Sequence, residues 1–222
     1  MKRAIHLNLF MVFLMLPFCI SATVKEKFKH TKTKTINKEF SVNKNATLKV
    51  NNSYGNIDVV TWNENRIVFQ ITITTSGNNE EKTLEKLKEI DVEFSSSSDL
   101  VSAETMFGNK KSGSWWNWGS SSKVNMKINY LIKIPITNAV NLNNDYGNIT
   151  VDKLQGVAKI NCDYGKITTS ELMADNNILN FDYTKGCQFE YIKSGKINAD
   201  YSDFTISKTN NIFINADYTN SK

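Results

Sequence analysis

The sequence predicts an all-β protein: a single-stranded β-solenoid of about 18-residue coils, preceded by a β-rich region that carries one short α-helix. Three observations support this prediction. A motif ending in tyrosine recurs along the C-terminal part of the chain, apolar residues alternate within each copy, and one earlier segment has helical spacing. The composition agrees, because 22% charged and 11% aromatic residues are ordinary globular values. They exclude a disordered or disulfide-dense chain.

Residues 1–22 have the pattern of a secretory signal peptide. A short basic start precedes the apolar run Leu7–Ile20, and the small residues Ser21 and Ala22 follow it. The run is too short for a comfortable membrane span, so no transmembrane segment is expected in the mature chain. A buried N-terminal helix is the weaker alternative, and acylation of Cys19 is disfavoured by the bulky residue before it. We therefore expect an exported protein of the periplasm, the outer-membrane surface or the extracellular medium.

Residues 23–37 are rich in Lys and Thr and are expected to form a flexible lead. Residues 38–137 are expected to form the β-rich region. Alternating apolar residues from Ile67 to Ile73 predict one strand, with further strands at residues 92–94, 100–107 and 124–134. Trp62 is expected to lie in the core.

One amphipathic helix is predicted over about residues 79–90. Asn78 followed by Glu81 fits an N-cap with a reciprocal acid, and Leu84, Leu87 and Ile90 fall on one helical face.

An array of repeats fills residues 138–222. Each copy contains the pattern Asn-x-Asp-Tyr, and successive tyrosines lie 17 to 19 residues apart. An isolated earlier copy, residues 51–54, has Ser53 in place of the aspartate. Repeats of this length indicate stacked units that bury one continuous core. The predicted structural ladders consist of the asparagines Asn143, Asn161, Asn180, Asn198 and Asn215 and the tyrosines Tyr146, Tyr164, Tyr183, Tyr201 and Tyr218.

Alternation within a copy predicts which side chains face inward. Ile160, Cys162 and Tyr164 are spaced by two, and the residues between them are polar, which is the period of a half-buried strand. Each copy continues after the bend with a second short strand. Two short strands cannot bury their inner face alone, so each copy needs its neighbours to cover it. Cys162 is therefore expected to be a core thiol, although the sequence does not decide whether it pairs with Cys187. An antiparallel meander or sandwich is the alternative, but it does not require the same residue type at the same point of every unit.

A tryptophan-rich loop, residues 108–122, is the first candidate binding site. Trp115, Trp116 and Trp118 lie among Gly, Ser and Lys residues. Trp offers a large flat face and a hydrogen-bond donor, which suits a sugar ring, a partner surface or a membrane interface. The alternative is that these rings fold back over an open side of the solenoid.

A row of carboxylates is the second candidate site. Carboxylates stacked at one strand spacing repel each other, so they persist if they are solvated, bonded to neighbouring amides, or bridged by a cation such as Ca²⁺. Backbone satisfaction at a recurrent bend is the favoured interpretation, and no other cofactor is predicted. The aspartates are Asp145, Asp163, Asp182, Asp200 and Asp217.

Other chemistries find little support in the sequence. The lysines are dispersed and Arg66 is the only arginine after residue 22, which argues against nucleic-acid binding. Asp163 and Asp182 could serve as an acid and base on a polysaccharide, but their spacing is that of the repeat itself. The sequence has no phosphate-binding glycine loop and no CxxC or HExxH metal spacing. No catalytic residue is assigned.

The chain resembles an exported bacterial family of β-strand-repeat domains of unknown function, often labelled putative adhesins. The residues that carry the resemblance are the Asn-x-x-Tyr-Gly-Asn-Ile copies at 51–57 and 143–149, Trp62-Asn63, the Lys/Glu-rich helix and the Tyr-Gly repeats. It extends from about Phe40 to the last residue. It implies a β-helix-like structure at a bacterial cell envelope and brings no catalytic residues. The sequence stops in mid-coil, where further coils or a cap are expected. Two alternatives stay open: a truncated product, and an end completed by another chain through end-to-end self-association.

Three functions are compatible with these features. The leading hypothesis is a noncatalytic, exported solenoid that binds a surface protein or glycan, or acts as an envelope scaffold. The second is a polysaccharide-acting β-helix enzyme. The third is a periplasmic accessory of an envelope regulatory system.

Overall fold

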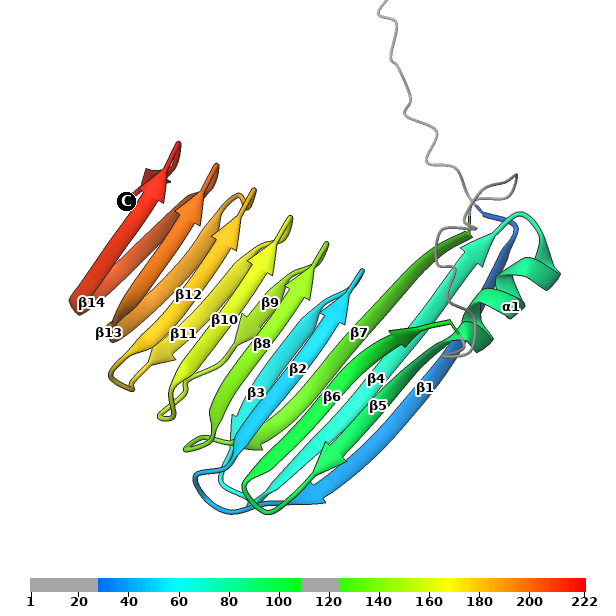
Figure 1. Cartoon of the computed structure of the whole chain (residues 1–222), viewed down its shortest axis with the longest axis horizontal. Coiled ribbons are helices and arrows are strands. Elements are labelled where there is room, and N and C mark those ends of the chain that lie inside the picture. The colour runs from blue at the N-terminus through cyan, green and yellow to red at the C-terminus, as the bar shows by residue number, and fades with distance from the viewer. Residues whose placement is uncertain (1–27, 109–123) are drawn as a thin grey trace, which may run out of the picture.

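Residues 28–108 and 124–222 are described by a computed structural model, in which they form fifteen strands and one α-helix (Figure 1). All the strands belong to one sheet that folds back on itself. The predicted all-β class with a single helix is confirmed. The predicted signal peptide, residues 1–22, lies outside the described residues.

The repeated motifs stack one above another as parallel strands. In this first row Asn161 lies opposite Asn143 on one side and opposite Asn180 on the other, so each residue pairs with its own kind. The isolated copy joins the same row, because Asn51 lies opposite Asn143. An antiparallel meander would instead reverse direction from copy to copy. The strands of the first row are β2 (Thr47–Ser53), β8 (Ala139–Asp145), β10 (Ala158–Asp163), β12 (Asn177–Asp182) and the last parts of β13 (Cys187–Asp200) and β14 (Asp203–Asp217).

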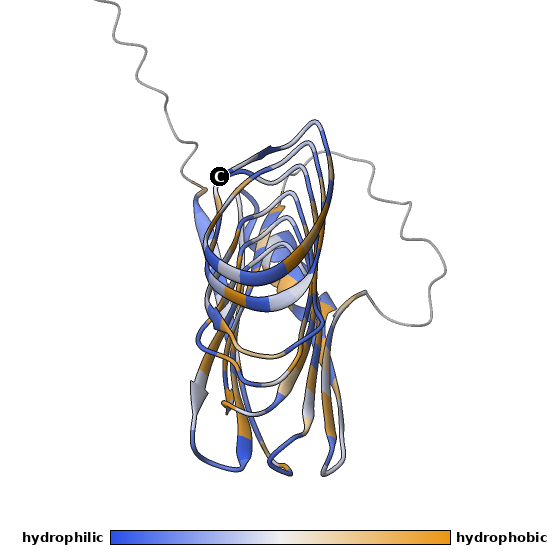
Figure 2. Cartoon of the chain, turned by 90° about the vertical axis from the view of Figure 1, so that its left-hand side faces the viewer, coloured by the Kyte–Doolittle hydropathy of each residue, from blue (hydrophilic) through white to orange (hydrophobic). Residues whose placement is uncertain are grey.

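The residues after each tyrosine form a second row of parallel strands. β13 and β14 run through the bend and belong to both rows: Phe189 pairs with Thr169 in the second row, and Asn198 pairs with Asn180 in the first. Viewed from one end, the successive copies nest behind one another (Figure 2). The other strands of the second row are β3 (Ile57–Trp62), β9 (Ile149–Val151), β11 (Ile167–Leu172) and β15 (Asn220–Ser221).

The core lies between the two rows. Ile149 is stacked between Ile57 and Ile167 in one row, and Ile160 between Leu142 and Leu179 in the other, all of them fully buried. Cys162 and Cys187 are buried free thiols, as expected for Cys162. Burial raises the pKa of Cys162 to about 12.

At the N-terminal end each row continues with one more parallel strand, β7 (Val124–Pro135) or β6 (Leu100–Phe107), followed by antiparallel strands. β7 pairs with β3 and with β4 (Arg66–Gly77), and β4 pairs with β1 (His30–Ser41). On the other row, β6 pairs with β2 and with β5 (Ile90–Ser96). The helix α1 (Glu80–Glu89) lies against β1 and β4.

Three expectations are corrected here. The predicted flexible lead, 23–37, is a strand from His30 onward, because its alternating Lys and Thr residues pair along the whole length of β4. The N-cap is Asn79, not Asn78: its side chain accepts a hydrogen bond from the Lys82 backbone N–H at 2.9 Å. Trp62 is half-buried rather than in the core, and the Arg66 guanidinium lies 4.7 Å from its ring centroid.

The predicted apolar helix face is also smaller than expected. Leu87 is buried, but Leu84 is 39% exposed and Ile90 is already the first residue of β5. A short helix that covers the end of a sheet needs to bury only one turn, here through Leu87 and Thr83.

In the first three copies a glycine follows the tyrosine, and the stacked backbones leave no room there for a side chain. A Cβ on Gly147 would lie 1.8 Å from the Gly55 carbonyl oxygen, and a Cβ on Gly165 would lie 2.0 Å from the Gly147 carbonyl oxygen. No real side chain tolerates such contacts. In the following copies Thr184 and Ser202 take this place, and their hydroxyls hydrogen-bond to each other at 3.1 Å.

We expect Gly165→Ala to destabilise the protein by about 3 kcal/mol, because its methyl group collides with a backbone carbonyl that two paired strands hold in place. Denaturant unfolding followed by circular dichroism measures the change. Gly186→Ala is the control: Gly186 has a positive φ of 70° but open space around it, so a cost of only about 1 kcal/mol is expected. Equal costs for the two variants would contradict the close stacking.

Candidate binding strip of stacked tyrosines and aspartates

The repeat tyrosines point outward, although their spacing predicted that they face inward. Each has a positive φ, from 49° at Tyr218 to 62° at Tyr54, and this left-handed conformation turns the side chain out of the alternation. Tyr146, Tyr164, Tyr183 and Tyr201 are each about half exposed. The inward position before the Asp remains buried in all copies but the last, as at Cys162 and Phe181.

The outward tyrosines form one continuous stack. The ring centroids of Tyr146 and Tyr164 lie 5.0 Å apart, and their planes differ by 6°. The stack continues in the same way through Tyr183, Tyr201 and Tyr218. At the other end Tyr54 stacks on Tyr146, and the edge of Phe107 closes the row. The predicted tyrosine ladder is therefore present, but on the surface.

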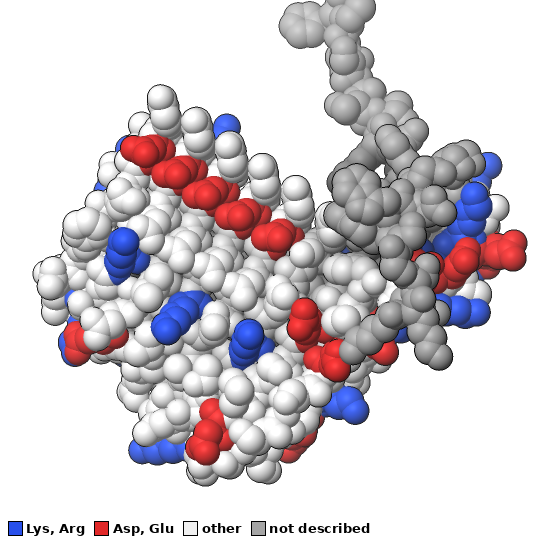
Figure 3. Space-filling view, in the orientation of Figure 1, with Lys and Arg blue, Asp and Glu red and all other residues white. Residues whose placement is uncertain are grey.

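The repeat aspartates run beside this stack as a row of carboxylates (Figure 3). The side chain of Asp163 accepts a hydrogen bond from the Asp182 backbone N–H at 3.2 Å, and Asp182 accepts one from the Asp200 N–H at 3.1 Å. Asp217 N–H donates to Asp200 in the same way. The pair that an enzyme hypothesis would use, Asp163 and Asp182, therefore has the same geometry as the rest of the row.

The electrostatics of the row are repulsive. Burial first, and then the neighbouring charges of Asp182 and Asp145, raise the pKa of Asp163, while the hydrogen bond from Asp182 N–H opposes them. A row of like charges at one strand spacing therefore favours a positively charged neighbour.

The asparagines two residues before the aspartates hold the copies together. Their side-chain amides form a chain of hydrogen bonds, from Asn198 to Asn180 at 2.6 Å, from Asn180 to Asn161 at 2.7 Å and from Asn161 to Asn143 at 2.5 Å. These half-buried amides satisfy one another, so their part in the fold is structural.

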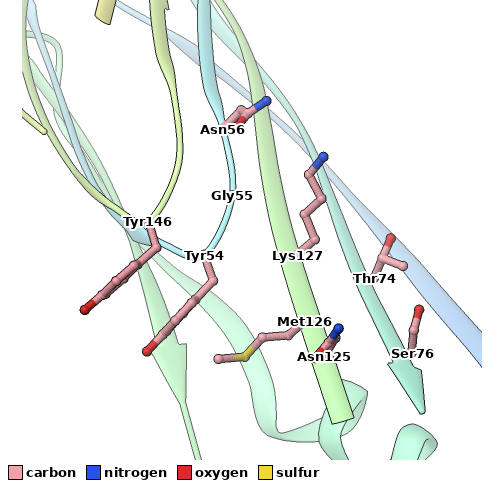
Figure 4. A pocket seen from close by; sticks show the side chains of 9 residues that line it. All are labelled: Tyr54, Gly55, Asn56, Thr74, Ser76, Asn125, Met126, Lys127 and Tyr146. Atoms are coloured by element: carbon pink, nitrogen blue, oxygen red, sulfur yellow. The ribbon is translucent and has the colours of Figure 1, made fainter. Parts of the chain in front are cut away.

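A shallow pocket of about 430 Å³ lies where the tyrosine stack meets the N-terminal region (Figure 4). The rings of Tyr54 and Tyr146 line one side, with the thioether of Met126 beside Tyr54. Thr74, Ser76, Asn125 and Lys127 supply hydroxyl, amide and ammonium groups on the other side. Sequence reasoning missed this pocket, because its two sides come from segments far apart in the chain.

The tryptophan loop and the Ca²⁺ site were the other sites predicted from the sequence. Trp115, Trp116 and Trp118 lie outside the described residues. Within residues 28–108 and 124–222, no group of three or more His, Cys, Asp or Glu side chains is placed to hold a metal ion. The Ca²⁺ hypothesis for the aspartate row stays a prediction. In the same two ranges, no helix is long and apolar enough to cross a membrane.

Several solved structures are similar to this chain. A putative cell adhesion protein from Clostridium sporogenes matches with 12% identity and a TM-score of 0.40, covering 86% of this chain and 100% of the other. A putative adhesin from Bacteroides fragilis has 12% identity and a TM-score of 0.29, covering 85% and 95%. A putative lipid binding protein from Parabacteroides distasonis has 8% identity and a TM-score of 0.28, covering 85% and 96%.

Two of these three names agree with the family that the repeats resemble. No family model matches the sequence, and no curated protein matches it.

We expect Asp163→Asn to raise the stability of the protein at neutral pH. Because the pKa of Asp163 is higher in the folded chain, the folded state holds this proton more tightly, and stability falls as the pH rises above about 3.8. Asparagine removes that cost and keeps an oxygen that can accept the Asp182 N–H.

Thermal unfolding at pH 7 and pH 3 measures the effect. The variant should melt a few degrees higher than the parent at pH 7, and the difference should disappear at pH 3, where both states are protonated. Glu190→Gln, which removes an exposed carboxylate outside the row, is the control. A lower melting temperature for Asp163→Asn at pH 7 would contradict the repulsive row.

Proposed function

We propose that this chain is a noncatalytic, exported β-solenoid that works as an adhesin-like binding module of the cell envelope, and that the strip of stacked tyrosines and aspartates is its contact surface. The export part of the proposal rests on residues 1–22. The solenoid part rests on the parallel, in-register pairing of copies that are 17 to 19 residues long. The binding part rests on the conformation of the repeat tyrosines and on the geometry of the strip.

The conformation of the tyrosines supports a role beyond folding. An aromatic residue with positive φ costs roughly 1–2 kcal/mol, and the chain carries this conformation in every copy. Stacking offsets the cost, at about 0.5–1.5 kcal/mol for each aromatic pair. A repeat that only needed a core could leave the tyrosine inside or replace it by a small turn residue. Strained, exposed aromatic side chains are typical of recognition surfaces.

The geometry of the strip indicates which partner it fits. Each internal ring has both faces against its neighbours, so a sugar ring has no free face to stack on except at Tyr218, which is 82% exposed. What the stack offers to solvent is a line of ring edges and phenol groups, with a parallel line of carboxylates about 4.8 Å apart. An extended, positively charged segment of a surface protein is complementary to both lines.

The single observation that carries this proposal is the unbroken pairing of an exposed aromatic stack with a carboxylate row across five successive copies. The carboxylates recur with the period of the fold and accept backbone hydrogen bonds. This arrangement suits a binding surface better than an acid–base pair, whose two members need different surroundings.

The test is calorimetric titration of the secreted chain with a decalysine peptide. The parent should bind it, although the formal net charge without residues 1–22, +3 from 25 basic and 22 acidic residues, opposes a cation. The affinity should fall as salt is added. The double variant Asp163→Asn/Asp182→Asn should bind about tenfold more weakly. Tyr183→Ala should also weaken binding, whereas Tyr183→Phe, which keeps the ring in the stack, should weaken it less.

The matched control is Glu171→Gln/Glu190→Gln, which removes two carboxylates from the second row of strands. It should leave the affinity unchanged. An equal loss of decalysine affinity in both double variants would mean that binding depends only on net charge, and would contradict a specific role of the strip. Failure of decalysine to bind the parent would overturn the proposed partner class.

A further inference from the structure

The last long strand, β14, has one edge without a partner strand over most of its length. It pairs with β13 on one side, and on the other side β15 covers only Asp203 and Phe204. From residue 207 to residue 217, no strand among the described residues lies against the outer edge. The backbone N–H and C=O groups of this edge thus have no strand partner among the described residues, and such an edge can accept another strand.

This open edge carries apolar side chains that are buried in the other copies. Ile214 is 40% exposed, whereas Ile197, its partner on β13, is fully buried. Ala216 is also exposed, whereas Ala199 is buried. A further layer would bury Ile214 and Ala216, as it does their counterparts. On the outer face Phe213 is 63% exposed.

The two other outer strands differ from β14 in charge. β1 carries Lys32, Lys34 and Lys38, and β5 carries Asp91 and Glu93, and charged residues of this kind discourage edge-to-edge pairing. Residues 209–216 of β14 contain neither a charge nor a proline. This unprotected segment has the composition that favours strand addition.

The sequence of this segment is symmetric about Phe213. It reads Asn211-Ile212-Phe213-Ile214-Asn215, the same in both directions. In an antiparallel pair related by a twofold axis at Phe213, each Ile212 lies opposite Ile214 of the second copy, on the inner face. Asn211 lies opposite Asn215 on the outer face, and the two phenylalanines face each other. Opposed residues thus match in both chemistry and face.

From these observations we propose that β14 is a homodimerisation edge, at which a second copy of this chain adds its own β14 in antiparallel register about Phe213. This pairing extends the core, because Ile212, Ile214 and Ala216 of both copies then lie on the inner face, between the two rows of strands. No like charges are opposed, since Lys208 faces Tyr218 and Asp217 faces Thr209. A twofold interface closes on itself and limits assembly to a dimer.

Sedimentation analysis of the secreted chain tests the stoichiometry. The parent should sediment as a concentration-dependent dimer. Phe213→Glu places two carboxylates opposite each other at the twofold axis and should give a monomer at concentrations where the parent is a dimer. Lys159→Glu is the control: Lys159 has the equivalent position on β10, an inner strand paired on both sides, and its variant should remain a dimer.

Disulfide trapping tests the register. Phe213→Cys should form a disulfide-linked dimer on mild oxidation, because antiparallel residues directly opposite each other have Cβ atoms about 4.5–5.5 Å apart. Asn215→Cys should not cross-link, since its opposite residue in the second copy is Asn211. The buried thiols of Cys162 and Cys187 should not react.

Three results would overturn the proposal. They are a parent that is monomeric at all concentrations, a Phe213→Glu variant that still dimerises, and cross-linking of Asn215→Cys equal to that of Phe213→Cys. Larger assemblies would instead indicate head-to-tail pairing of β14 with β1 or β5 and would also overturn it. None of these results depends on decalysine binding.

Discussion

The structure depends on one constraint: successive copies pair in parallel with each residue above its counterpart. Asn161 lies between Asn143 and Asn180, so their amides can bond in a chain, and Asp182 N–H meets the side chain of Asp163. The same register brings each tyrosine ring onto the next at about 5 Å. A slip of one residue would turn each strand's inner face outward and break all these contacts at once. In the first three copies Gly55, Gly147 and Gly165 allow the backbones to approach this closely.

This constraint also explains why the surface is so regular. Whatever one copy presents to solvent, the next presents again one strand spacing away. Repetition brings costs as well as contacts. Every repeat tyrosine has a positive φ, and at Asp163 burial and the neighbouring carboxylates raise the pKa. Aromatic stacking and backbone hydrogen bonds offset these costs within the protein. A positively charged partner would relieve the repulsion further, which is why the strip is the proposed contact surface. Where the register reaches β14 the inner face is left uncovered, and the proposed dimer continues the stack there.

The sequence predicted the parts of the fold that periodicity controls. The strands at residues 67–73, 100–107 and 124–134, the position of the helix, and the inward placement of Ile160 and Cys162 followed from local spacing. The outward turn of Tyr164 could not be predicted from the alternation, because alternation does not reveal a positive φ. The recurrence of a Tyr-Gly pair, as in Tyr164-Gly165, was the available signal of a positive φ. The strand at His30–Ser41 was missed because its polar alternation becomes meaningful only when β4 lies beside it. The pocket at Tyr54 and Met126 unites segments that only the fold brings together.

The most direct measurement is the stability of chains from which repeat residues are deleted. Removing residues 164–182 takes out one whole copy and joins Asp163 to Tyr183, so the remaining layers keep their register. Stacked coils that touch only their neighbours predict a β-rich protein that still unfolds cooperatively. Removing residues 164–172 takes out half a copy, including β11, and should prevent folding because the following strands change rows. If the whole-copy deletion is as unfolded as the half-copy deletion, the in-register stack is contradicted.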